Sequence, residues 1–434
     1  MKIAIIGAGF IGTITGFCLA DIGHDVVFFD KSEEKLNSIK NGDPLFYEPG
    51  LKEMMHRTMK EGKVMFAKSA SEAIQNSDVV FICVATKLNP DNSLDFTHLI
   101  DVSADIGKNL NKPKVVVSKL ILPPGASEII INTIKENNKD NVEFYMVSNP
   151  GFLTGGKAIE NFKNPDRIVI GTDGSQQAKE VMENIYKGIA DQNHQIFWTD
   201  LKTANMIEYS VNTILAMKVS MINQLSEYCE KIGVDITEVS KGISMDSRIG
   251  PGYLSAGVGY GGFSFPKIVR SLSKIMKDSK CHTELIDSIE IVNNRQKLNV
   301  IPKVMRLLGI ISGKTIAVLG LSFKPNTSNI KESPAIQIIQ ELQRLGAYVK
   351  VYDPEAMSEA KKVLKGVIYA ENTMKCVENS DLMLIATGWD VFKNLDFNKV
   401  KEVMRKPNIV DGWNLYNPKE LKELGFNYYG VGRK

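Results

Sequence analysis

The residues with the clearest chemistry lie near the N-terminus, in the segment Gly7-Ala-Gly-Phe-Ile-Gly12. Three glycines at this spacing allow a tight turn, a close approach of the backbone to a pyrophosphate and close packing of the next helix. Asp30 ends the following predicted strand, where its carboxylate can accept from ribose hydroxyls and would repel a 2′-phosphate. The segment therefore predicts a site for NAD rather than NADP. The predicted cofactor contacts are Gly7, Gly9, Phe10, Ile11, Gly12, Asp30, Lys31 and Thr86.

Two other groups of residues could serve a reaction or hold an anion. Glu208 and Asn212 are four positions apart in a predicted helix over 204–232, so they share one face. Ser264 and Lys267 follow a second glycine-rich segment. Because no histidine lies near Ser264 in the sequence, we interpret its hydroxyl as hydrogen-bonded or solvent-facing rather than nucleophilic.

The elements that must position these residues follow from the pattern of apolar runs. Strands are predicted at 2–6, 25–29, 79–84, 114–117, 144–147 and 167–170, which is typical of a doubly wound sheet. From about 199 to 300 the pattern is helical, and Met206, Met217 and Met221 are expected to fill its core. Strands return after Lys314, around a helix over 335–345, but without the three-glycine turn.

These patterns predict an α/β protein with two Rossmann-type, doubly wound parallel-sheet domains joined by a central helical domain. The predicted ranges are 1–198 for the NAD-binding domain, 199–300 for the helical connector and 301–434 for the second sheet domain. The second sheet is not expected to take a pyrophosphate as the first one does. Two such sheets joined by helices predict a ligand cleft between them.

Composition limits the classes of partner. The 434 residues are 43% hydrophobic and 24% charged, as in ordinary soluble globular proteins, and a net charge of +3 is too small to favour nucleic acid. Five scattered cysteines without a CxxC pair predict buried thiols, a reducing compartment and no metal site. No signal peptide or long apolar run is present in the sequence, so the expected location is cytoplasmic, without a membrane partner.

Several further stretches closely resemble the UDP-glucose dehydrogenase family, nearly end to end. They are Tyr47-Glu-Pro-Gly50, Ser148-Asn-Pro150 with Phe152-Leu153, Asn164-Pro-Asp-Arg-Ile-Val-Ile-Gly171, Asp246-Ser-Arg-Ile-Gly250, Gly259-Tyr-Gly-Gly262 with Phe265-Pro-Lys267, and Gly320-Leu-Ser-Phe-Lys-Pro-Asn-Thr327. The resemblance implies NAD as cofactor, a UDP-sugar as ligand, a C-terminal UDP-sugar-binding domain and a homodimer built on the central helices. It also implies substrate contacts at Phe152, Leu153, Asn212, Arg248, Tyr253, Leu254, Gly261, Phe265, Lys267, Phe323 and Lys324.

Members of that family oxidise the primary alcohol of a nucleotide sugar to a carboxylate with two NAD. A cysteine captures the intermediate aldehyde, carboxylates activate water, and cationic and amide donors hold the oxyanion. Matched position by position, this chain keeps only Asn212 of the seven catalytic residues. The other six positions hold Ile121 for threonine, Gly151 and Gly155 for glutamates, Glu208 for lysine, Ser264 for cysteine and Ile268 for aspartate. A further cation of the family is replaced by Trp413.

The glycine turns and the Phe-Pro-Lys stretch are intact, so the losses are concentrated at chemical positions. The sequence therefore predicts a member that binds NAD and a UDP-sugar without four-electron oxidation, acting through its complex or a partner enzyme. Two alternatives stay open. One is an oxidoreductase or epimerase that uses hydride transfer only, and the other is ordinary oxidation of UDP-glucose to UDP-glucuronate.

Overall fold

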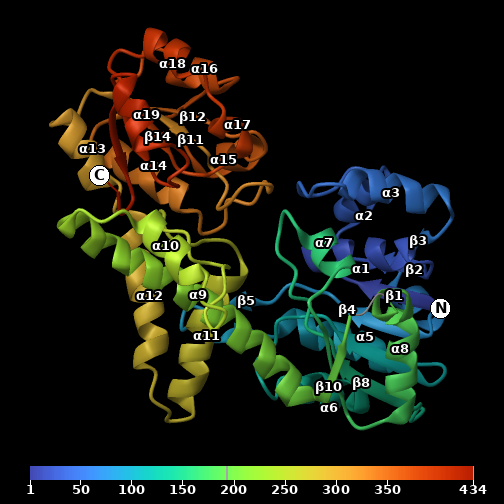
Figure 1. The fold of residues 1–434 in the computed structure, drawn as a ribbon. Helices are drawn as coiled ribbons and strands as arrows, with labels where there is room; N and C mark the ends of the chain where they lie inside the picture. Colours follow the sequence, from blue (N-terminus) through green and yellow to red (C-terminus); the bar gives the residue numbers. More distant parts are fainter. Residues whose placement is uncertain (192–193, 434) are drawn as a thin grey trace. The chain divides into compact units, whose positions relative to one another are not determined.

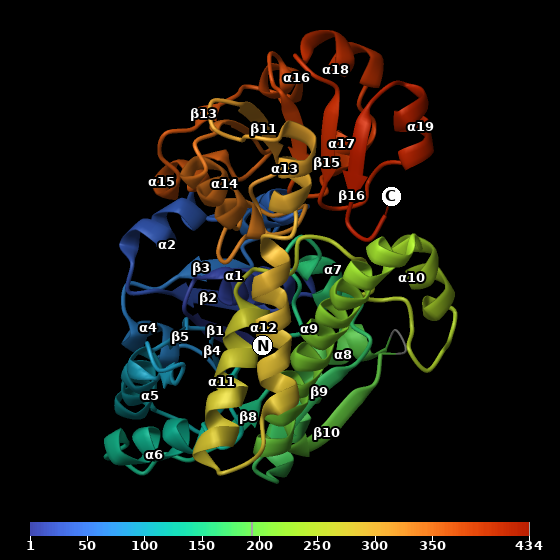
Figure 2. The same ribbon diagram turned by 90° about the vertical axis from the view of Figure 1, so that its left-hand side faces the viewer.

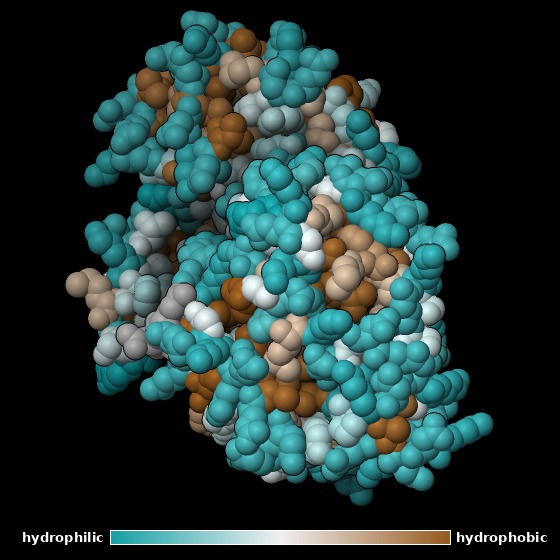
Figure 3. Space-filling view, turned by 90° about the vertical axis from the view of Figure 1, so that its right-hand side faces the viewer, coloured by the Kyte–Doolittle hydropathy of each residue, from teal (hydrophilic) through white to brown (hydrophobic). Residues whose placement is uncertain are grey.

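A computed structural model describes residues 1–191 and 194–433 of the chain. The chain divides into two compact units, an N-terminal unit, Met1–Val211, and a C-terminal unit, Asn212–Lys434. Among the described residues, no helix is long and apolar enough to cross a membrane. Hydrophilic side chains cover most of the face shown in Figure 3, and the hydrophobic ones on it gather in separate patches.

The N-terminal unit is built on an eight-stranded sheet with the order β10-β9-β8-β7-β4-β1-β2-β3 (Figure 1). Its strands are β1 (Lys2–Ile6), β2 (Asp25–Phe29), β3 (Val64–Phe66), β4 (Val79–Ile82), β7 (Lys114–Ser118), β8 (Phe144–Ser148), β9 (Ile168–Thr172) and β10 (Ile196–Asp200), with β5 (Lys87–Leu88) and β6 (Leu94–Asp95) as a small separate pair. The predicted sheet is confirmed, but β8 and β9 pair antiparallel, so the sheet is mixed rather than wholly parallel.

Alternate side chains of each central strand enter different cores, which explains the continuous apolar runs. Ile3 and Ile5 of β1 face one core, and Ala4 and Ile6 face the other. The first core is covered by α1 (Phe10–Asp21), α3 (Leu51–Lys60), α7 (Ala158–Lys163) and α8 (Gln176–Ala190), and the second by α4 (Ala70–Gln75), α5 (Thr97–Asn109) and α6 (Ser127–Asn137). The short α2 (Glu33–Lys40) begins at Ser32, whose hydroxyl accepts from the Lys35 N–H.

Helix α9 (Leu201–Ile232) begins in the N-terminal unit and ends in the C-terminal unit. The helical part of the C-terminal unit continues with α10 (Ile236–Ser244), α11 (Ser264–Asp278), α12 (Glu284–Lys297) and α13 (Ile301–Leu308). Helices α11 and α12 lie side by side (Figure 2), and the Ser220 hydroxyl of α9 donates to the Ile289 carbonyl of α12 at 2.9 Å. The expectation that the methionines of α9 fill a core is wrong for Met206 and Met221, whose exposed fractions are 41% and 58%.

The second sheet has six strands in the order β13-β12-β11-β14-β15-β16, all paired in parallel. The strands are β11 (Thr315–Leu319), β12 (Tyr348–Tyr352), β13 (Ile368–Tyr369), β14 (Leu382–Ile385), β15 (Asn408–Asp411) and β16 (Asn427–Gly430). The helices around it are α14 (Pro334–Arg344), α15 (Met357–Val363), α16 (Thr373–Val377), α17 (Asp390–Lys393), α18 (Phe397–Val403) and α19 (Pro418–Glu423). The predicted return of a Rossmann-type sheet after Lys314 is confirmed.

Candidate functional site

The turn between β1 and α1 has the geometry of a phosphate-binding turn. Gly7 has φ +106°, and a Cβ built on it would lie 2.8 Å from the Cys83 carbonyl carbon. A Cβ on Gly12 would lie 1.8 Å from the Gly7 carbonyl oxygen, so the helix can pack here only without a side chain. Above Gly9, by contrast, the space is open to 4 Å, and Gly9, as the N-cap residue of α1, has no side chain to cap the helix. The turn therefore presents the N-terminus of a helix to an open space, which fits a pyrophosphate.

Asp30 supports this turn from the end of β2. Its Oδ2 accepts from the Ala8 N–H at 2.8 Å, and its Oδ1 accepts from the Ser32 N–H at 2.9 Å. The carboxylate is half-buried and keeps lone pairs for ribose hydroxyls. Lys31 is exposed and pairs with Asp101 at 3.1 Å.

The remaining predicted cofactor residues lie around the same turn or at a neighbouring strand end. Phe10 and Ile11 occupy the first turn of α1, and the Phe10 ring lies 4.9 Å from that of Phe46. Thr86 is buried just beyond the end of β4, which pairs with β1.

The N-terminal unit holds four of the seven predicted catalytic positions. Ile121 follows the end of β7, while Gly151 and Gly155 follow the end of β8. Glu208 lies on α9 and is 2% exposed. At these four positions, Glu208 is the one side chain that can exchange a proton.

A buried lysine lies within the electrostatic reach of Glu208. Lys119 donates to Asn149 Oδ1 at 2.9 Å and to the Tyr186 hydroxyl at 3.2 Å. Burial lowers the pKa of Lys119 to about 8, and the charge of Glu208 is among the influences that act against this shift. The anion at position 208 thus has a cation near it inside the N-terminal unit, a feature that the sequence reasoning missed.

Phe152, predicted to contact substrate, has a strained backbone. Its φ is +48°, a left-handed conformation that is rare for a bulky side chain, and the Arg167 guanidinium lies 3.9 Å from its ring centroid. Its neighbour Leu153 is half-buried and packs against the core of the N-terminal unit. Such strain persists where the surroundings fix the conformation, and it is frequent at ligand sites.

The C-terminal unit holds the other three catalytic positions. Asn212 is half-buried on α9, and Ser264 is the first residue of α11. Ile268 is one turn further along α11 and is fully buried. An apolar side chain thus occupies a packed position where the resemblance to the family implies an acid.

The glycine segment before α11 packs closely against the loop after β11. A Cβ on Gly262 would lie 2.8 Å from the Phe323 ring, and the Gly262 N–H donates to the Lys331 carbonyl at 2.8 Å. The Lys267 and Lys331 ammonium groups lie 4.7 and 4.3 Å from the centroid of the Phe263 ring. The structure therefore brings Lys267 close to the loop that carries Phe323 and Lys324.

The other predicted substrate residues of the C-terminal unit are spread over a longer loop. Tyr253 has φ +64°, and its ring lies 5.8 Å from that of Phe265. Leu254 is buried. Arg248 has a side chain that is 87% exposed and pairs with Asp246 at 2.6 Å.

Asp353, at the end of β12, corresponds in position to Asp30 at the end of β2. It is 1% exposed and accepts from the Leu321 and Ser322 N–H groups at 2.7 and 3.1 Å. The Trp389 indole donates to the same carboxylate oxygen at 3.1 Å. Backbone N–H groups and the Trp389 indole already donate to this buried carboxylate, so it is not available to ribose hydroxyls. This is a physical reason why the second sheet is not expected to hold a dinucleotide as the first one does.

Two further features of the C-terminal unit involve other residues. The Trp413 indole donates to the Ala386 carbonyl at 2.8 Å, so it stabilises the fold at a position where the resemblance implies a cation. A cavity of about 900 Å³ lies elsewhere in the C-terminal unit, lined in part by Arg295, Arg306 and Tyr429, and contains none of the predicted substrate contacts.

Comparison with known proteins gives consistent matches along the whole chain. Three models of the UDP-glucose/GDP-mannose dehydrogenase family match it: the NAD binding domain at residues 1–190, the central domain at 202–295 and the UDP binding domain at 317–418. A UDP-glucose 6-dehydrogenase of Rhizobium meliloti is 40% identical, with 100% of both chains covered. The chain belongs to the UDP-glucose/GDP-mannose dehydrogenase family.

Other members of the UDP-glucose/GDP-mannose dehydrogenase family are similarly close. The UDP-glucose 6-dehydrogenase TuaD of Bacillus subtilis is 37% identical, covering 100% of this chain and 93% of that protein. The structure of a UDP-glucose dehydrogenase from Pyrobaculum islandicum superposes with a TM-score of 0.92 at 31% identity, covering 100% of this chain and 98% of the other. The predicted family, the fold class and the NAD-binding character of the N-terminal domain are therefore confirmed.

Proposed function

We propose that this chain is an NAD-dependent oxidoreductase that acts on a UDP-sugar, with UDP-glucose as the first substrate to test. The observation that carries the proposal is the similarity over the full length to UDP-glucose 6-dehydrogenases. The uncapped N-terminus of α1 and the open space above Gly9 support cofactor binding at the predicted residues. When bound, NAD supplies the hydride acceptor. The chain's own residues bind and orient the two ligands, and Glu208 is positioned on α9 as the candidate group to accept the alcohol proton.

A second candidate function is binding of both ligands without turnover, and the side chains at the catalytic positions favour it. Ser264 cannot form a thiohemiacetal, and a serine hydroxyl needs an adjacent strong base to react. Gly151, Gly155 and Ile268 supply no carboxylate to activate water. These absences affect the oxidation of the aldehyde to the acid more than that of the alcohol to the aldehyde. Hydride transfer from the alcohol requires no covalent capture.

The number of hydrides transferred per sugar tests the proposal. Purified protein is incubated with NAD and each of a panel of UDP-sugars, NADH is followed by its absorbance, and binding is measured in parallel by calorimetry. We expect NADH to form with fewer than two hydrides per UDP-glucose, because the aldehyde cannot be captured. Binding of both ligands without NADH would select the second candidate function, and two hydrides per sugar would mean that the route to the acid is intact.

Restoring the thiol alone should not restore acid formation. In Ser264→Cys we expect UDP-glucuronate to stay at background, because the carboxylates and the cation of the family are still missing at Gly151, Gly155, Ile268 and Glu208. The measurement is chromatographic separation of the sugar products. The control is iodoacetamide labelling located by peptide mass spectrometry, which distinguishes the new thiol from the exposed Cys281. Substantial acid from this single change would contradict the assignment of roles.

A homodimer is part of the same proposal. Exposed apolar side chains follow one side of α9 at spacings of seven, four, three and four residues, which is the repeat of a helix-packing seam. They are Ile214, Met221, Leu225, Tyr228 and Ile232. A second copy of the chain fits this stripe, since a twofold axis lets the same surface pair with itself.

Two charged residues in the stripe should prevent dimer formation. We expect Met221→Glu with Tyr228→Glu to run as a monomer in light scattering coupled to size exclusion, because two buried carboxylates cannot be paired there. Met305→Glu is the matched control, since Met305 is also an exposed methionine of the C-terminal unit. A monomeric wild-type protein, or a dimeric double variant, would count against the stripe as the interface.

Two further parts of the proposal rest on the sequence. We keep the division into 1–198, 199–300 and 301–434, with the UDP-sugar contacts in the last two parts and at Phe152 and Leu153. We also keep a reducing, cytoplasmic location: the five cysteines are free thiols, four of them buried, and Cys281 is the exception to the predicted burial. Under the second candidate function, the chain acts through its ligand complex or through a partner enzyme.

A further inference from the structure

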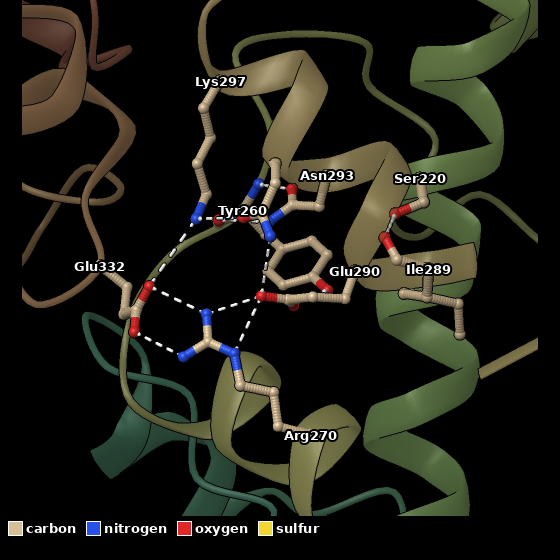
Figure 4. A network of polar contacts seen from close by, with 9 residues as sticks. Ser220, Tyr260, Arg270, Ile289, Glu290, Asn293, Lys297 and Glu332 are labelled. Carbon is tan, nitrogen blue, oxygen red and sulfur yellow. Dashed lines mark hydrogen bonds and ion pairs between the residues drawn. The ribbon is translucent and has the colours of Figure 1, made fainter. Parts of the chain in front are cut away.

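A network of charges joins two helices of the C-terminal unit to the loop after β11 (Figure 4). Arg270 of α11 donates to Glu290 of α12 through Nε at 2.9 Å and Nη2 at 2.6 Å, and to Glu332 through Nη1 at 2.9 Å. Lys297 Nζ, at the end of α12, lies 3.7 Å from Glu332. We call these four residues the Arg270 network. The Arg270 guanidinium points between the two carboxylates, with Glu290 on one side and Glu332 on the other.

The Arg270 network is partly shielded from water and balanced in charge. The side chain of Lys297 is 1% exposed and that of Arg270 is 26% exposed. Two cations face two anions, so no member is left as an isolated buried charge. A planar fork that bonds two carboxylates fixes their relative geometry, which a lysine ammonium group does less well.

The backbone at Glu332 shows what this geometry holds in place. Glu332 has φ +53°, a conformation that costs energy in a residue with a side chain. The Glu332 carbonyl oxygen packs against Gly261, because a Cβ built on Gly261 would lie only 2.3 Å from it. The neighbouring Lys331 carbonyl accepts from the Gly262 N–H. With the left-handed turn at Glu332, the loop thus packs closely against the glycine segment before α11.

The glycine segment is fixed from its other side by Asn293 of α12. The Tyr260 N–H donates to Asn293 Oδ1 at 2.8 Å, and Asn293 Nδ2 donates to the Tyr260 carbonyl at 3.1 Å. The Tyr260 hydroxyl also reaches Glu290 of the Arg270 network at 3.4 Å. Helix α12 therefore holds the glycine segment directly and the loop through Arg270.

We propose that Arg270 is a positioning residue for the UDP-sugar. It holds Glu332 in the left-handed turn and so fixes the loop 323–332 against the glycine segment 259–263. Because Lys324 and Lys331 are on this loop and Lys267 follows the glycine segment, the network sets the arrangement of three ammonium groups toward a nucleotide diphosphate. This inference rests on the proposed function, in which the C-terminal unit binds the UDP group.

The test uses the full chain with Arg270→Lys, which keeps the charge but loses the fork. We expect the dissociation constant for UDP, measured by calorimetry, to rise at least tenfold, while that for NAD changes less than twofold. Amide hydrogen exchange should accelerate over 259–263 and 323–332. Arg344→Lys is the matched control, since Arg344 forms an exposed pair with Glu341 in the same unit, and it should change neither readout.

A second variant keeps the test decisive if Arg270→Lys does not fold. Glu332→Gln keeps the shape of the side chain and an acceptor oxygen, and we expect the same weaker UDP binding and faster exchange. A folded Arg270→Lys or Glu332→Gln with unchanged exchange over both segments would overturn the inference. Absence of UDP binding in the wild-type protein would instead refute the proposed UDP site, and the exchange rates would still decide whether Arg270 fixes the loop.

Discussion

Replacing Gly12 by alanine is expected to abolish measurable NAD binding. The new Cβ would lie 1.8 Å from the Gly7 carbonyl oxygen, so α1 must move away from the turn that presents its N–H groups. We expect NAD affinity to fall at least ~100-fold, equivalent to about 2.8 kcal/mol. Overpacking should also lower the free energy of unfolding by roughly 1–3 kcal/mol. Calorimetry with NAD and urea unfolding measure the two effects.

Gly9→Ala is the matched variant in the same turn. Its φ is −80° and nothing lies within 4 Å of the added Cβ, so the stability should change by less than about 0.5 kcal/mol. The methyl group nevertheless occupies the open space where a pyrophosphate would approach, and we expect NAD affinity to fall by about tenfold or more. Equal NAD affinity in Gly12→Ala and the wild-type protein would show that the cofactor does not use this turn.

Asp353→Ala is expected to have the largest effect on stability. Besides Leu321, Ser322 and Trp389, the carboxylate accepts from the Glu355 and Ala356 N–H groups at 2.9 and 2.7 Å. Alanine removes this acceptor from several backbone N–H groups, at about 1–3 kcal/mol for each one that water cannot reach. The Trp389 indole keeps a second acceptor, the Ser322 hydroxyl at 3.1 Å. We expect the free energy of unfolding to fall by about 4 kcal/mol or more in urea titrations.

Asp30→Ala separates the roles of the two corresponding aspartates. Asp30 is half-buried and accepts from two backbone N–H groups, so we expect a loss of only about 1–2 kcal/mol in the free energy of unfolding. NAD affinity should fall by roughly 10–100-fold, because hydrogen bonds to a charged acceptor contribute about 1.5–3 kcal/mol. A larger loss of stability in Asp30→Ala than in Asp353→Ala would contradict this division of roles.

The sequence predicted the parts of the fold that local signals determine. Apolar runs placed β1 and β2 at their observed bounds, because alternate side chains of these strands pack against two different cores. Strand direction has no such signal: the antiparallel pairing of β8 with β9 depends on the path of the connecting chain. The burial of Met221 was misjudged for a related reason, since an apolar residue at helical spacing can face either a core or an interface.

The candidate site was predictable where one residue type has one physical use. Gly7 and Gly12 are required by close contacts that admit no side chain, and Asp30 by its place at a strand end. The partners of Arg270 were not predictable, because Glu332 lies 62 positions away and Arg-to-Glu pairs are abundant in any sequence. Nor could the sequence show that Lys119 lies within the electrostatic reach of Glu208, since folding brings together residues from a loop and a helix.

The thiols of the chain differ greatly in accessibility. Burial raises the pKa of Cys18, Cys83 and Cys376 to about 12, and Cys229 is also buried. Cys281, between α11 and α12, is exposed. A maleimide dye should therefore attach at this one position of the unmodified protein, at the end of α11 opposite Ser264. A single label at this position therefore requires no engineered cysteine.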